Sequence, residues 1–132
     1  MKKYQFNKLI RSKLPAKMVT EGILVNSKIL SDSEYIAELK RKLLEEADEV
    51  VNATTDKALA EELADVLEVI DAIIRTSKIT REDIEQVKLD KRNINGDFSQ
   101  ENYINYIEVA EDNRPVIAYL ENKNRHYRYE KD

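Results

Sequence analysis

Cysteine is absent from these 132 residues, and glycine and proline occur only twice each. Without cysteine the chain forms no disulfide and offers no thiolate to a metal. Each glycine and each proline falls at a plausible boundary between elements. No apolar run approaches membrane-spanning length, and residues 1–6 lack the apolar core of a secretory signal. We therefore expect a cytoplasmic protein with no membrane partner.

Charged residues are unusually frequent, at 36% of the chain, and this excess indicates long exposed helix faces. The 26 acidic residues outnumber the 22 basic ones and give a net charge of −4, so we expect no nucleic-acid partner. A length of 132 residues predicts one domain over 1–132, small enough that association with further copies would help to stabilise it.

Capping boxes mark two predicted helix starts, at Ser31 with Glu34 and at Thr80 with Asp83. Behind each box, apolar residues recur at the spacing of three and four that buries one face of a helix. We expect a short helix between Pro15 and Gly22, long helices over 32–51 and from about residue 57, and a third from residue 81 to just before residue 95.

These patterns predict an all-α fold, an antiparallel helical bundle completed by oligomerisation. The apolar stripes of the two long helices are wider than one packed neighbour would cover, so copies of the chain would cover each other. In the C-terminal quarter, residues 103–109 and 115–120 read as short strands, and the last eight residues read as a polar tail. Segment 99–132 receives no role from its sequence.

Two pairs of carboxylates lie at matching positions on the predicted long helices. Glu46 and Glu49 occupy one edge of the first apolar stripe, and Glu62 and Asp65 occupy the same rotational side of the second, whereas Glu45 points the opposite way. If the helices pack antiparallel, the pairs converge, and a hard cation such as Mg²⁺ would relieve their repulsion. Solvated carboxylates paired with lysines are the other interpretation, and spacing alone leaves both open.

The pattern Glu45-Glu46-x-x-Glu49, a short gap, then Glu62-x-x-Asp65 resembles the signature of the MazG-like, all-α nucleoside triphosphate pyrophosphohydrolases. That superfamily also holds dimeric dUTPases and phosphoribosyl-ATP pyrophosphohydrolases. The resemblance covers about residues 4–98. It includes the stretches 39–44 and 61–70, and a start over 7–15 that resembles a small house-cleaning subgroup in which an aspartate is expected where this chain has Ser12.

The resemblance implies Glu46, Glu49, Glu62 and Asp65 as Mg²⁺ ligands, with Mn²⁺ as a substitute, and a homodimer or homotetramer. It implies a nucleotide substrate cleaved between its α and β phosphates to a monophosphate and pyrophosphate, as in nucleotide-pool cleansing. Mg²⁺ usually takes only one or two carboxylates, so four indicate either more than one ion or one carboxylate, for which Glu49 is our candidate, acting as the general base. The alternatives are a phosphoribosyl-ATP substrate or a non-catalytic helical interaction module.

Two basic groups are candidates for binding the phosphates of a substrate. Lys88, Lys91 and Arg92 form a row on the third predicted helix, and Lys8 and Arg11 precede the first. The row also fits lysine and arginine stems that lie along the edge of a core, and the N-terminal pair also fits ordinary surface charge. The only histidine, residue 126, lies in the basic and aromatic tail and has no partner in the sequence that would make it catalytic.

Overall fold

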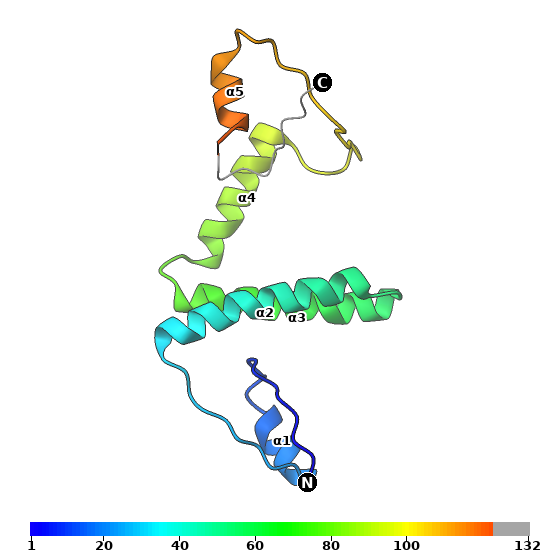
Figure 1. Cartoon of the computed structure of the whole chain (residues 1–132), viewed down its shortest axis with the longest axis vertical. Helices are drawn as coiled ribbons and strands as arrows, with labels where there is room; N and C mark the ends of the chain where they lie inside the picture. Colours follow the sequence, from blue (N-terminus) through cyan, green and yellow to red (C-terminus); the bar gives the residue numbers. More distant parts are fainter. Residues whose placement is uncertain (123–132) are drawn as a thin grey trace. The chain divides into compact units, whose positions relative to one another are not determined.

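The computed structural model describes residues 1–122 of the chain (Figure 1). Every regular element in that range is helical, with no strand, so the predicted all-α fold is confirmed. The helices are α1 (Leu14–Thr20), α2 (Asp32–Asn52), α3 (Asp56–Thr76), α4 (Arg81–Asn95) and α5 (Arg114–Leu120). The chain divides after Lys91 into two compact units, which we describe separately.

The predicted capping box at the start of α2 is present. Ser31 has an extended backbone, and its hydroxyl accepts a hydrogen bond from the amide of Glu34 at 3.3 Å. The Glu34 carboxylate in turn accepts from the amide of Ser31 at 3.0 Å. Two amides that the helix itself leaves without partners are thereby satisfied, and α2 starts at the predicted residue.

Helices α2 and α3 form an antiparallel hairpin, in which the two long helices lie side by side (Figure 1). Only residues 53–55 connect them. The Thr55 hydroxyl accepts from the amide of Ala58 at 3.1 Å and so caps α3. Because the connection is so short, the end of α2 and the start of α3 are held at the same level of the hairpin.

The core of the hairpin is small. Leu39 of α2 and Val69 and Ala72 of α3 are its buried apolar residues. Partly buried side chains pack around them, including one from the N-terminal segment: Leu9, Tyr35, Leu43 and Ile73. The packing of Leu9 places the residues that precede α1 against the hairpin.

A set of large apolar residues on α2 and α3 remains exposed in the single chain. They are Leu59, Leu63 and Leu67 on the apolar stripe of α3, and Leu44 and Val51, which widen the stripe of α2. Apolar residues exposed together on two neighbouring helices are candidates for contact with another copy of the chain.

Proline and glycine bound α1 as the sequence predicts. Pro15 lies in the first turn, where its missing amide hydrogen costs nothing. Gly22 has a φ of 80°, in the left-handed region that favours glycine after a helix. The amide of Ile23 donates to the carbonyl of Met18 at 3.0 Å, so the last turn of α1 is closed by a backbone hydrogen bond.

The capping box at the start of α4 is also present. The amide of Thr80 donates to the Asp83 carboxylate at 2.7 Å, and the amide of Asp83 donates to the Thr80 hydroxyl at 3.1 Å. Helix α4 begins at Arg81 and ends at Asn95, within a residue of the predicted end. Gly96 follows with a φ of 78°, which explains why the helix stops there.

The predicted short β element is wrong for the part of the chain that the structure describes. Residues 103–109 adopt no regular structure, and 115–120 belong to helix α5. Pro115 lies in the first turn of α5, where its fixed φ favours a helix over a strand.

None of the helices within residues 1–122 combines the length and apolar character that crossing a membrane requires. The predicted polar tail, with His126, lies outside the described residues.

The capping box at Ser31 predicts a measurable loss of stability on its removal. Ser31→Ala should lower the free energy of unfolding by about 1 kcal/mol, because the amide of Glu34 loses its acceptor. Urea unfolding followed by circular dichroism measures this difference. Ser27→Ala, in the exposed segment before α2, is the control and should change it by less than about 0.5 kcal/mol.

Candidate metal centre

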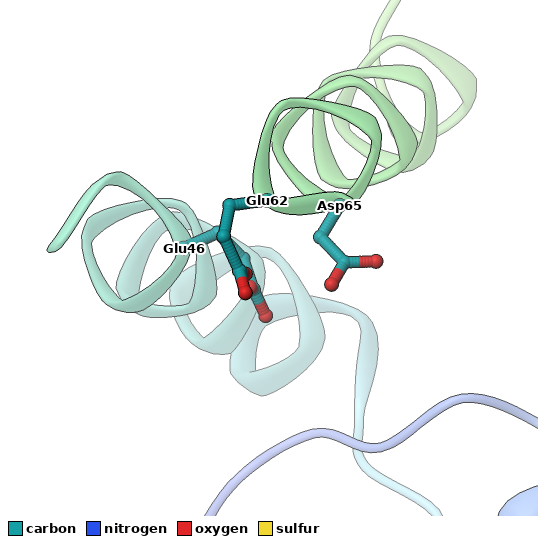
Figure 2. Close-up of side chains that lie close together, drawn as sticks. All are labelled: Glu46, Glu62 and Asp65. Carbon is teal, nitrogen blue, oxygen red and sulfur yellow. The ribbon is translucent and has the colours of Figure 1, made fainter. Parts of the chain in front are cut away.

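Three of the four predicted carboxylates converge on one side of the hairpin. Glu46 comes from α2, and Glu62 and Asp65 come from successive turns of α3 (Figure 2). One carboxylate oxygen from each lies within 4.8 Å of the others. The antiparallel packing of the two helices therefore gathers side chains that the sequence keeps well apart.

Glu46 is the buried member of this group, with only 7% of the residue exposed. A buried carboxylate needs a compensating charge, and Lys42, one turn earlier on α2, supplies it at 2.9 Å. Burial opposes the charge of Lys42, yet its hydrogen bonds to Glu46 and Glu45 raise the pKa of Lys42 above its usual value. Lys42 is therefore firmly protonated beside Glu46.

Glu62 is the carboxylate of the group without a neutralising partner. Loss of solvent around its half-buried side chain raises the pKa of Glu62, and the negative charges of Glu49, Asp65 and Glu46 raise it further. No ion pair to Glu62 occurs within residues 1–122, because Lys42 pairs with Glu46 and Arg11 with Asp65. Three carboxylates and two cations leave one negative charge, and it is concentrated at Glu62.

The N-terminal segment supplies the second of these cations. The Arg11 guanidinium donates to the Asp65 carboxylate across 54 residues of sequence. That hydrogen bond raises the pKa of Arg11 against the small opposing effect of burial. Three residues earlier, Lys8 pairs with Glu45 at 3.0 Å. The segment that precedes α1 is thus held to the hairpin by ion pairs with both α2 and α3.

The three converging carboxylates fit a hard divalent cation. Carboxylate oxygens are the ligands that Mg²⁺ and Mn²⁺ prefer, and two oxygens on the same Mg²⁺ lie no more than about 4.2 Å apart. The three oxygens lie within 4.8 Å of one another, which is comparable to that limit. A small rotation of the half-buried Glu62 and Asp65 side chains, or one ligand acting through a water molecule, would complete the coordination. Glu46, Glu62 and Asp65 are the residues that would hold the ion.

Glu49 and Glu45 lie outside the converging group. Glu49 is exposed and is close enough for its charge to raise the pKa of Glu62, but it does not belong to the three carboxylates that lie within 4.8 Å. Glu45 is occupied by Lys8 and by Lys42, the latter at 3.2 Å. Because Lys42 contacts both Glu45 and Glu46, the Glu45 carboxylate lies beside the group and does not point to the opposite side of α2 as expected.

The basic row on α4 makes no ion pair with the carboxylate group in the described range. Lys88 pairs with Glu85 on its own helix at 3.2 Å. Lys91 and Arg92 are exposed in the single chain, and so is the nearby Val87. Their predicted contact with substrate phosphates stays a prediction.

Lys42, the counter-ion of Glu46, is a residue of this centre that the sequence analysis did not predict. Its spacing of four residues from Glu46 on one helix is a recognisable signal for an ion pair. The spacing therefore allows the ion pair to be predicted, but a lysine four residues from a glutamate is common on any charged helix. Only the burial of Glu46 separates this pair from an ordinary surface pair.

Comparison with known proteins gives no relative, because no family model, no curated protein and no solved structure matches the chain. The resemblance to MazG-like pyrophosphohydrolases therefore stays a prediction from the motifs.

The raised pKa of Glu62 predicts a pH-dependent gain of stability on its neutralisation. Above that pKa, wild-type Glu62 is charged and repelled in the folded state, so Glu62→Gln should raise the Tm of the cation-free protein. The gain should disappear as the pH falls through the raised pKa, because protonated glutamate is then as neutral as glutamine. Thermal unfolding with EDTA at about pH 7 and about pH 3.5 measures both values.

Glu61→Gln is the matched control for this measurement. Glu61 is the exposed neighbour on the same turn of α3, and its charge has the smallest of the effects that raise the pKa of Glu62, so its replacement should raise the Tm less than Glu62→Gln does. A gain from Glu62→Gln that is equally large in acid would contradict charge repulsion and point to helix propensity instead.

Proposed function

We propose that this chain is a Mg²⁺-dependent pyrophosphohydrolase of the MazG-like type. It would cleave a nucleoside triphosphate or a related nucleotide between the α and β phosphates, releasing a monophosphate and pyrophosphate. The observation that supports this most directly is the convergence of Glu46, Glu62 and Asp65 from two helices. Glu46 is buried beside the other two carboxylates, and the single charge of Lys42 does not neutralise all three, so a bound cation would stabilise the group.

The chain's own residues divide the work of this reaction. Glu46, Glu62 and Asp65 would hold the cation, which when bound neutralises phosphate charge and makes a water molecule more acidic. Lys42 holds Glu46 in place through its ion pair. Glu49, exposed one turn beyond Glu46, is the proposed general base that accepts the proton of the attacking water.

Cationic side chains beside the carboxylates would attract the phosphate chain of the substrate. Arg11 and Lys8 already lie at this side of the hairpin through their pairs with Asp65 and Glu45. A guanidinium suits phosphate oxygens because it donates two parallel hydrogen bonds. Lys88, Lys91 and Arg92 are proposed as further phosphate contacts.

Pyrophosphate release is the direct test. Purified protein with Mg²⁺ should release pyrophosphate, and not orthophosphate, from at least one compound in a screen of nucleotides that includes phosphoribosyl-ATP. Addition of EDTA should abolish the release. Orthophosphate as the first product, or release that EDTA does not change, would contradict the proposed reaction.

Substitutions in the carboxylate group sharpen this test. Glu46→Gln and Glu62→Gln keep the shape of each side chain but remove its charge, and each should lower the turnover rate about a hundredfold or more. Glu61→Gln, on the same helix but outside the group, should retain nearly full activity. Equal losses in Glu61→Gln and Glu62→Gln would show that the converging carboxylates are not the reactive centre.

The proposal includes a cytoplasmic homodimer or homotetramer, supported by the apolar residues that α2 and α3 leave exposed. Helices from two copies that close a four-helix bundle would bury this surface around a two-fold axis.

Light scattering at micromolar concentration should give at least twice the chain mass of 15.4 kDa. Leu67→Glu, which places a charge on the exposed stripe, should shift the protein toward the monomer. A folded, active monomer in the wild type would exclude this assembly.

A further inference from the structure

The two cations at the carboxylate group reach it in different ways. Lys42 is fixed by its position one turn from Glu46 on the same helix, and its side chain is only 20% exposed. Arg11 comes from the N-terminal segment, 54 residues from its partner Asp65, and its side chain is 57% exposed. Lys42 is therefore built into the hairpin, whereas Arg11 is a partner that can leave.

Arg11 and a divalent cation would share one carboxylate, Asp65. Asp65 is one of the three carboxylates that would hold the ion, and the guanidinium of Arg11 already uses one of its oxygens. A divalent cation brings two positive charges to the group, so the charge of Arg11 is no longer needed there. An exposed ion pair of this kind contributes little free energy, so a cation displaces it easily.

Displacement would not carry Arg11 away from the centre. Leu9 packs against the hairpin core, and Lys8 is paired with Glu45, so the segment stays anchored two to three residues before Arg11. The released guanidinium is then a free, fully charged donor within a side chain's length of the cation. An anionic ligand that binds the cation would meet it there.

We propose that Arg11 is an exchangeable counter-ion, which neutralises Asp65 while the carboxylates hold no cation and transfers to a phosphate oxygen of the ligand once a divalent cation has bound. This inference rests on the proposed binding of a divalent cation to Glu46, Glu62 and Asp65. It goes further, because Arg11 would weaken the binding of the divalent cation and strengthen the binding of the phosphate ligand. It also orders their binding, with the cation first and the phosphate second.

Two titrations of the full-length chain test the exchange. In the first, Mg²⁺ alone is titrated by calorimetry, and Arg11→Gln should bind it about two- to fivefold more tightly than wild type, because a competing cation is gone. In the second, inorganic pyrophosphate is titrated at saturating Mg²⁺, and Arg11→Gln should bind it about tenfold more weakly, because a charged donor is gone. Arg11→Lys keeps the charge and should restore Mg²⁺ affinity toward the wild-type value.

Arg81→Gln is the matched control. Arg81 pairs with Asp71 on α3 by the same kind of contact, and the exposure of the two partners, 49% and 37%, is close to the 57% and 38% of Arg11 and Asp65. Asp71 is not among the converging carboxylates, so Arg81→Gln should leave both affinities unchanged.

Opposite shifts in the two titrations support the exchange, because damage to the fold would weaken both ligands together. Weaker or unchanged Mg²⁺ binding in Arg11→Gln overturns it, as does unchanged pyrophosphate binding. Arg11 and the cation sharing Asp65 through its two different oxygens would give the unchanged result. If wild type binds no Mg²⁺ at all, the proposed function fails as well, and this outcome is distinct from binding that Arg11 does not influence.

Discussion

Repulsion between carboxylates held close together is the constraint on which the rest of this hairpin depends. Glu46, Glu62 and Asp65 can lie within 4.8 Å only because positive charge is brought to them. Lys42 brings it from within α2, and Arg11 brings it from the N-terminal segment. That segment has no regular structure before α1, so its position depends on these charges and on one apolar contact. The carboxylates thus order a part of the chain that local propensity leaves free.

Local signals in the sequence were sufficient for the helices of the first unit. The capping boxes at Ser31 and Thr80 and the left-handed Gly22 each act over a few residues, so their effect can be read without knowing the fold. The strands expected near the C-terminal end were wrong because an apolar run of six residues has no periodicity of its own. In 115–120, the proline in the first turn was the signal for a helix.

The candidate centre was predictable to the extent that helical geometry determines it. Rotational phase placed Glu46, Glu62 and Asp65 on one side, and a short connector made the helices antiparallel. Nothing local indicates that Arg11 contacts Asp65 or that Lys8 contacts Glu45, because these pairs form across 54 and 37 residues. Long-range pairs depend on how the N-terminal segment folds back, and one sequence contains no signal for that path.

The connector of three residues between α2 and α3 has a consequence for how this chain can change. An insertion there would lengthen the turn, so the end of α2 and the start of α3 would no longer be held at the same level of the hairpin. The turn would then no longer keep Glu62 and Asp65 beside Glu46, although both helices would still form. Residues 97–113, which precede α5, do not hold two packed helices at one level, so we expect them to tolerate changes in length. We therefore expect the turn of the hairpin to accept insertions less readily than residues 97–113 do.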